Sequence, residues 1–130
     1  MGIGVGDYDL DGSLDILKTH FADDTPILYH NDGKGYFDDV TTRAGLAVET
    51  RYVSWGAGIF DLDNDGYPDL FWVTGGVYPE IEAKLPQYPA KTPRVVFRNL
   101  GNGKFEEFRT HSSRQLDQNS KDKAVSGLRL

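Results

Sequence analysis

The residues best suited to chemistry are the aspartates of two short acidic runs. Residues 61–69 read Asp-Leu-Asp-Asn-Asp-Gly-Tyr-Pro-Asp, with carboxylates at positions 1, 3, 5 and 9 and glycine at position 6. Residues 7–15 show the same arrangement 54 positions earlier. Carboxylates crowded in this way raise one another's cost of ionisation unless a cation is bound. Calcium takes about six to eight oxygen ligands in flexible geometry, so the two runs predict two calcium sites.

Each predicted site takes its ligands from alternate residues of one loop. Gly12 and Gly66, at position 6, permit a bend that a residue with a Cβ would resist. Position 7 of such loops usually contributes its main-chain carbonyl, and the aspartate at position 9 supplies the closing carboxylate. The predicted ligands are Asp7, Asp9, Asp11, Ser13 and Asp15 in the first loop, and Asp61, Asp63, Asp65, Tyr67 and Asp69 in the second.

Two other interpretations of the acidic runs fit less well. An EF-hand needs a bidentate glutamate at position 12, where this sequence has Lys18 and Trp72. Magnesium demands rigid octahedral geometry and retains water. One isolated Asp-x-Asp-Gly turn would indicate a metal-free surface loop. Two full copies at matching positions favour calcium.

The loops sit at corresponding places in two repeated units. Strands are expected at 2–6, 14–21, 27–30 and 36–41 in the first unit. The matching segments of the second unit are 56–60, 70–73, 95–99 and 101–108. Internal repetition of this length is typical of repeat architectures, and four antiparallel strands make one β-propeller blade. We therefore predict an all-β chain with about two four-stranded antiparallel propeller blades and the start of a third.

The second unit carries an insertion. The offset between equivalent residues rises from 54 to 68, which places 14 extra residues between Thr74 and Pro93. The predicted divisions are 1–51 for the first repeat, 52–111 for the second, and 112–130 for a polar tail or partial third repeat. Residues 80–85 could form one helical turn. A long loop on a rigid scaffold either carries binding function or covers a sheet edge.

Composition narrows the possible functions. The net charge is −6, and eight of the 20 acidic residues lie in the two loops. The absence of cysteine excludes disulfides, thiolate zinc sites and cysteine nucleophiles. The sequence has no basic stripe of the kind that indicates nucleic-acid binding. It also has no apolar run long enough for a membrane helix. The N-terminus has no signal-peptide pattern, and we expect the chain to begin inside a repeat, as a fragment would.

Histidines and aromatic residues are expected to be structural. The sequence offers no arrangement of Asp or Ser partners for His20, His30 or His111, so it does not predict an enzyme. The aromatic residues at repeat-equivalent or strand positions are predicted to form the blade core. They are Tyr29, Phe37, Phe60, Trp72, Phe97 and Phe105.

The repeated pattern Gly-x-Gly-x-x-Asp-x-Asp-x-Asp-Gly-x-x-Asp-Leu/Ile resembles the FG-GAP/VCBS repeats of integrin-α-like β-propellers. Residues 75–80 together with 96–105 are similar to the cartilage acidic protein / ASPIC–UnbV branch of secreted proteins. The resemblance implies a secreted calcium-binding propeller, extracellular or periplasmic, with a role in cell adhesion or ligand binding. It assigns metal binding to the eight loop aspartates.

Two functional hypotheses follow. The first is a calcium-binding propeller module with a structural, adhesion or ligand-binding role, a protein or glycan partner, and self-association through open blade edges, whose N–H and C=O groups lack partners. The alternative is an accessory or catalytic propeller domain of a secreted carbohydrate-active enzyme, because paired carboxylates can act as acid and base. Acids packed at metal-ligand spacing favour the first hypothesis.

Overall fold

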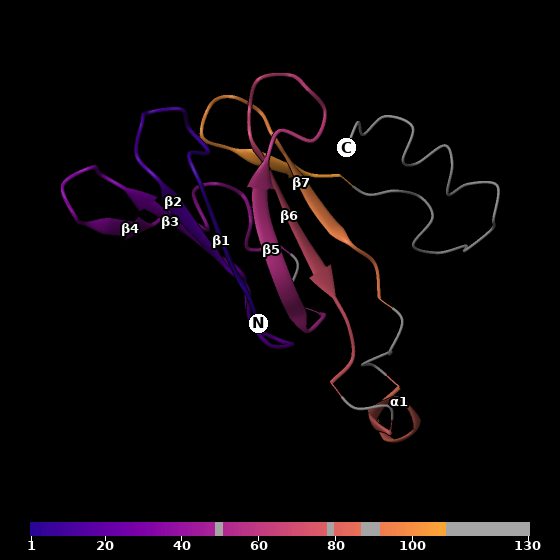
Figure 1. Ribbon diagram of the computed structural model, residues 1–130. Coiled ribbons are helices and arrows are strands. Elements are labelled where there is room, and N and C mark those ends of the chain that lie inside the picture. Colours follow the sequence, from indigo (N-terminus) through magenta and orange to yellow (C-terminus); the bar gives the residue numbers. More distant parts are fainter. Residues whose placement is uncertain (49–50, 78–79, 87–91, 109–130) are drawn as a thin grey trace.

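The chain folds into two four-stranded sheets (Figure 1). The computed structural model describes residues 1–48, 51–77, 80–86 and 92–108. The first sheet, here the first blade, contains β1 (Ile3–Gly6), β2 (Asp15–Lys18), β3 (Ile27–Asn31) and β4 (Phe37–Asp39). The second blade contains β5 (Ser54–Phe60), β6 (Asp69–Thr74), β7 (Val95–Asn99) and β8 (Phe105–Glu107).

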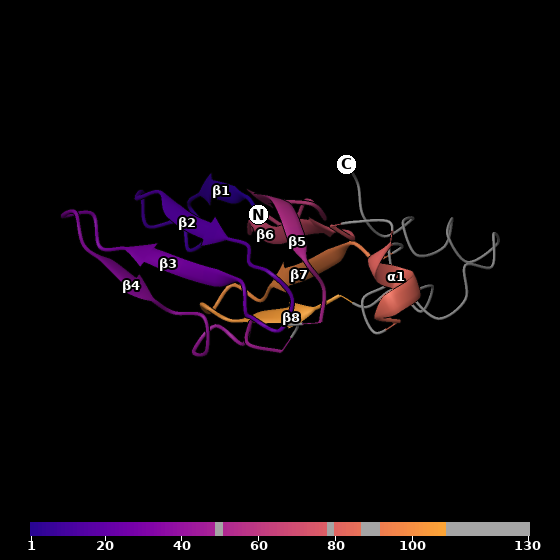
Figure 2. The same cartoon turned by 90° about the horizontal axis from the view of Figure 1, so that it is seen from below.

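Each blade is an antiparallel meander in which every strand pairs with the next in sequence. Both sheets have the same strand order. In Figure 2 the first sheet runs from β1 at the top of the view to β4 at the bottom, and in the second sheet β7 and β8 lie below β6. The prediction of an all-β chain with two antiparallel propeller-type blades is confirmed. The proposed third unit, 112–130, lies outside the described residues.

The innermost strands of the two blades, β1 and β5, approach each other closely. A Cβ on Gly4 would lie 3.0 Å from the Cα of Gly58, and one on Gly2 would lie 2.5 Å from the carbonyl oxygen of Trp55. A larger residue at either position would push the strands apart. The hydroxyl of Thr19 donates a 2.6 Å hydrogen bond to that same carbonyl and ties the blades together. Glycine in these strands therefore permits the close approach of the two backbones.

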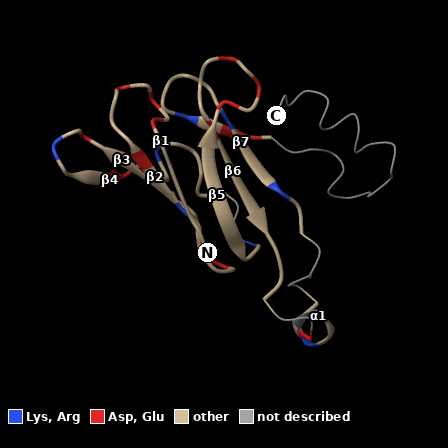
Figure 3. Cartoon of the chain, in the orientation of Figure 1, with Lys and Arg blue, Asp and Glu red and all other residues tan. Residues whose placement is uncertain are grey.

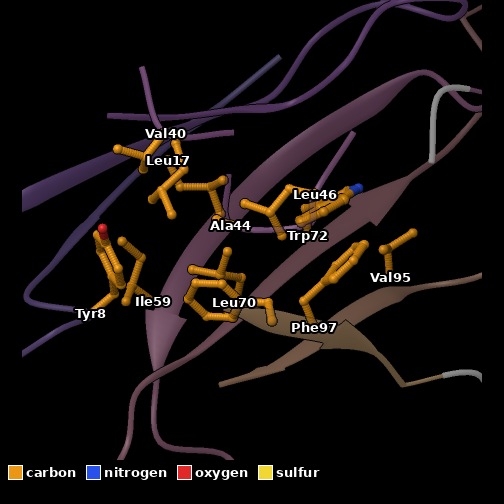
Figure 4. Packing of buried hydrophobic residues seen from close by; sticks show 12 residues of the cluster. Tyr8, Leu17, Val40, Ala44, Leu46, Ile59, Leu70, Trp72, Val95 and Phe97 are labelled. Carbon is orange, nitrogen blue, oxygen red and sulfur yellow. The ribbon is translucent and has the colours of Figure 1, made fainter. Parts of the chain in front are cut away.

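The hydrophobic core lies between the blades and not within either one (Figure 4). Trp72 and Phe97 stack with ring centroids 5.3 Å apart, and Tyr8 reaches across to Phe105 at 5.7 Å. The prediction that all six aromatic residues are core is wrong for Phe37 and Phe60, which are exposed, and for Tyr29, which is half-buried and lies outside the buried cluster. Each blade has two faces, and only one face of each is covered by the other blade. The buried cluster is Tyr8, Leu17, Leu28, Val40, Ala44 and Leu46 with Ile59, Leu70, Trp72, Val95, Phe97 and Phe105.

The second acidic loop and the short helix of the insertion lie at opposite ends of the second blade. Figure 3 shows both acidic loops at the top of the view, whereas the short helix α1 (Ile81–Lys84) lies at the bottom of Figure 1. This helix matches the single turn expected at 80–85. Within the described residues, no helix is long and apolar enough to span a membrane.

Candidate metal centre

The first acidic loop connects β1 to β2 and is closed by its own carboxylates. Asp7 accepts main-chain hydrogen bonds from Asp11 at 3.1 Å and from Gly12 at 2.8 Å. Asp11 accepts one from Ser13 at 2.8 Å. Gly12 has φ +91°, a conformation that suits glycine. Side-chain oxygens thus replace the missing main-chain acceptors of the turn, as Asp commonly does in tight turns.

The second loop, between β5 and β6, repeats this geometry. Asp61 accepts hydrogen bonds from the main-chain N–H of Asp65 at 3.2 Å and of Gly66 at 2.9 Å. Asp65 accepts one from Tyr67 at 2.9 Å. Gly66 has φ +90°, and Asn64 has φ +60° as does its counterpart Leu10. The same sequence pattern therefore builds the same loop twice.

The ninth-position aspartates, Asp15 and Asp69, are buried at the bases of the loops. Asp15 accepts main-chain hydrogen bonds from Tyr8 at 3.1 Å and Asn31 at 2.9 Å. Asp69 is held in the same way, by Leu62 at 3.0 Å and Asn99 at 2.8 Å. Burial raises the pKa of both carboxyl groups. Each one joins the start of its loop to the third strand of its blade, so it has a structural role whether or not a metal is bound.

Three of the four aspartates in each loop converge. Carboxylate oxygens of Asp7, Asp9 and Asp15 all lie within 4.8 Å of one another. The same holds for Asp61, Asp63 and Asp69. Carboxylate oxygens suit hard cations such as calcium, so the donor sets fit the predicted ion. The fourth aspartates, Asp11 and Asp65, lie outside these two groups of three, although both belong to the same loops.

The position-7 side chains turn toward the hairpin between the third and fourth strands. A Cβ on Gly33 would lie 2.9 Å from the Ser13 hydroxyl oxygen. A Cβ on the equivalent Gly101 would lie 2.9 Å from the Tyr67 ring. A ligand atom from Ser13 or Tyr67 would therefore be the main-chain carbonyl, which stays a prediction.

A basic side chain reaches each acidic loop from the third strand of its blade. Nδ1 of His30 lies 3.3 Å from both Asp9 Oδ2 and Asp15 Oδ1, and Nε2 lies 3.8 Å from Asp11 Oδ2. In the second blade, Nε of Arg98 lies 3.2 Å from Asp63 Oδ2, and Nη2 lies 3.9 Å from Asp65 Oδ2. These residues occupy equivalent positions, 68 apart.

The expectation that the histidines lack acidic partners is wrong for His30 and His20. His20 Nδ1 lies 2.7 Å from Asp24 Oδ2. The partners of His30 lie 15 to 21 positions away in the chain, and strand pairing brings them close. The repeat offset was the available signal, because it aligns His30 with Arg98 and places a basic group beside an acidic loop in both units. His111 lies outside the described residues.

The basic side chains only partly compensate the negative charge of the loop carboxylates. Burial, together with the charges of Asp15 and Asp11, raises the pKa of Asp9 to about 6. Burial and the charge of Asp69 also raise the pKa of Asp63. A group whose pKa is raised in this way is poorly stabilised in its charged form. An additional cation at either loop would relieve that cost.

Comparison with known proteins agrees with the two-repeat organisation of the chain. The sequence profile described as FG-GAP-like repeat matches residues 7–72, which is just over half of the chain. This chain belongs to the FG-GAP-like repeat family. The matched span runs from the first residue of the first acidic loop into β6 and so includes both loops. No match was found among curated proteins. Membership of the family and the two four-stranded sheets together identify the chain as a β-propeller repeat module.

Proposed function

We propose that this FG-GAP-like repeat module binds two calcium ions, one at each acidic loop, and that the ions stabilise its blades. The observation that carries the proposal is the convergence of three carboxylates in each loop, twice over, in matching main-chain geometry. The residues that would hold the ions are Asp7, Asp9, Asp11, Ser13, Asp15, Asp61, Asp63, Asp65, Tyr67 and Asp69.

Calcium would act on stability and not on a reaction. Each ion supplies two positive charges to carboxylates whose ionised forms are disfavoured at Asp9, Asp15, Asp63 and Asp69. A ligand that binds only the folded state stabilises it by RT ln(1 + [L]/Kd). Each loop joins the first two strands of its blade, so a bound ion would stabilise the pairing of β1 with β2 and of β5 with β6.

The wider role that we propose is that of a secreted module, extracellular or periplasmic, that works in cell adhesion or ligand binding. Calcium sites of extracellular modules commonly have dissociation constants of about 0.1–1 mM, which suits exposed loops such as these. The partner would be a protein or a glycan. Residues 75–80 and 96–105, with their glycine-rich and Asn-Leu-Gly-Asn-Gly-Lys-Phe stretches, support placement in the cartilage acidic protein / ASPIC–UnbV branch.

Calorimetric titration of chelator-treated chain with calcium tests the proposal. We expect two ions per chain and a higher melting temperature with calcium. Asp9→Asn and Asp63→Asn should each remove one site, and the double variant should remove both. Glu80→Gln, an exposed acid near α1 at the far end of the second blade, should change nothing. No heat and no thermal shift up to about 10 mM calcium would refute calcium binding.

A further inference from the structure

The two acidic loops differ in the donor atoms that surround them. Each loop has a group of three convergent carboxylates, as described above. Among the described residues, the first loop has a further convergent group, in which an imidazole nitrogen of His30 joins carboxylate oxygens of Asp9 and Asp11. One ligand atom from each of these three residues lies within 4.8 Å of the other two. The first loop therefore offers nitrogen as well as oxygen donors.

The imidazole of His30 faces carboxylates with both of its nitrogens. Nδ1 lies 3.3 Å from Asp9 Oδ2 and from Asp15 Oδ1, and Nε2 lies 3.8 Å from Asp11 Oδ2. Nδ1 is buried and forms no hydrogen bond, although a buried polar atom normally has a partner. Two ligands at about 2.0–2.1 Å from one tetrahedral zinc ion lie about 3.3–3.4 Å apart. The separation of Nδ1 and Asp9 Oδ2 therefore suits two ligands of one metal ion.

The position of the imidazole is fixed by its surroundings. His30 lies on β3, and its ring stands edge-on to the ring of Tyr8, with centroids 6.1 Å apart and an interplanar angle of 77°. The next residue, Asn31, donates its main-chain N–H to Asp15 and so ties β3 to the base of the loop. A metal-binding histidine usually directs its second nitrogen at a carboxylate, carbonyl or water, which fixes the ring. Whichever nitrogen of His30 binds, the other one faces a carboxylate.

The donor atoms indicate which class of cation each loop can take. Carboxylates and carbonyls suit calcium and magnesium, whereas imidazole suits zinc and other transition metals. Zinc is commonly held by three protein ligands drawn from histidine nitrogens and carboxylate oxygens, with water in a fourth position. Arg98, the equivalent of His30 in the second loop, has no acceptor atom and stays charged. A nitrogen ligand from this strand position is therefore available only at the first loop.

We propose that the first loop is also a site for a divalent transition metal of the zinc class, with His30, Asp9 and Asp11 as its ligands. This inference rests on the proposed function, because it takes the first loop to be a cation site, and it adds a second class of cation. Asp9 belongs to both convergent groups of the first loop, so zinc and calcium compete there. The second loop binds calcium alone, and zinc replaces one of the two calcium ions.

Calorimetric titration of the chelator-treated full chain with zinc chloride tests the proposal. We expect one zinc ion per chain, and zinc bound beforehand should abolish one of the two calcium-binding events. His30→Arg, which gives the first loop the basic residue of the second, should weaken zinc binding at least about a hundredfold, because partners of the ligands alone contribute about 10–100-fold. Asp63→Asn, the matched change in the second loop, should leave zinc binding unchanged.

His20 provides the second control, since its Nδ1 lies 2.7 Å from Asp24 Oδ2. His20→Gln should bind zinc like wild type. Nuclear magnetic resonance of the wild type gives a readout that needs no variant, because zinc should shift the imidazole nitrogen resonances of His30 and not those of His20. Circular dichroism of each variant checks that lost binding is not lost fold.

Three results would overturn the inference. One is a wild type that binds no zinc up to about 1 mM. Another is a folded His30→Arg variant that binds zinc as tightly as wild type, which would leave His30 as a counter-charge only. The third is zinc binding that shifts the resonances of His20 instead and is lost in His20→Gln. Two calcium ions bound without any zinc would overturn this inference alone, whereas zinc binding without calcium would refute only the calcium function.

Discussion

The two acidic loops share one main-chain skeleton and differ in the charge that approaches it. In both loops, the aspartate at position 1 accepts main-chain hydrogen bonds within the turn, and position 6 is a glycine with positive φ. The aspartate at position 9 is buried and accepts hydrogen bonds from the start of the loop and from the third strand, and we call it the buried clamp. In the first loop the neighbouring base is His30, and in the second it is Arg98. A guanidinium is permanently charged, so the second loop has a built-in counter-charge. The repeat therefore determines the geometry of both loops, whereas one residue on the third strand determines how much of the negative charge of each loop is compensated within the chain.

Removal of the buried clamp should have the largest effect. Asp15→Ala and Asp69→Ala each leave two main-chain N–H groups without acceptors, all of them buried except the partly buried N–H of Asn31. The cost is about 1–3 kcal/mol per group. We expect a loss of about 2–5 kcal/mol in the free energy of unfolding, measured by urea denaturation.

The loss should be greater for Asp69→Ala. Its partner Asn99 also donates a 2.8 Å side-chain hydrogen bond to the carbonyl of Tyr8 in the first blade, so the second clamp supports the interface between blades. Glu80→Ala serves as the control. A larger loss for Asp15→Ala would show that the first loop is the more important support.

The loop glycines come next. Gly12→Ala and Gly66→Ala should each cost about 1–2 kcal/mol, because alanine is strained at positive φ. A Cβ at either site meets no atom within 4 Å, so the two costs should be nearly equal. Gly56→Ala is the control, since its Cβ would make only an ordinary 3.8 Å contact with Val73. Thermal denaturation with chelator present measures all three, and unequal costs would mean that the loops differ in backbone as well as in charge.

The exchange of the basic residues should have a smaller effect. Arg98→Gln removes a half-exposed ion pair, worth about 0.5–1 kcal/mol. Calcium affinity at the second loop should therefore rise roughly two- to five-fold, measured by calorimetry on an Asp9→Asn background that silences the first loop. Arg98→Lys, which keeps the charge, should leave the affinity near that of the background. Weaker binding after Arg98→Gln would assign Arg98 a supporting role in the site.

The smallest effect concerns pH. The raised pKa of Asp9, about 6, lies above its ordinary value of about 3.9, so the folded state retains a proton that the unfolded state has lost. Without metal, this contribution is present below about pH 4 and is lost as pH rises through about 6. In chelator, melting curves from pH 4 to 7 should show less of this decline in Asp9→Asn than in wild type or Glu80→Gln. An identical slope in all three would contradict the raised pKa.

The sequence alone was sufficient to predict the local structure, namely the two loop turns, the strands and the short helix. The glycine at position 6 and the aspartate at position 1 determine each loop, because turn closure depends on residues within five positions of one another. Alternation and repetition were enough for eight strands in two units, since pairing follows chain order. Strand ends differed from expectation by a few residues: β2 spans Asp15–Lys18 and not 14–21. Even the helical turn at Ile81–Lys84 was visible in sequence.

Only the tertiary structure decided which residues meet across distance. Phe37 and Phe105 are equivalent in sequence, yet one is exposed and the other buried, because a blade can be covered only by a neighbour and the first blade lies at one end of the pair. The sequence alone did not predict acidic partners for His30, which the pairing of β3 in the sheet places beside Asp9 and Asp15. Repeat equivalence is a property of local sequence, whereas burial and electrostatic environment depend on what packs against each copy.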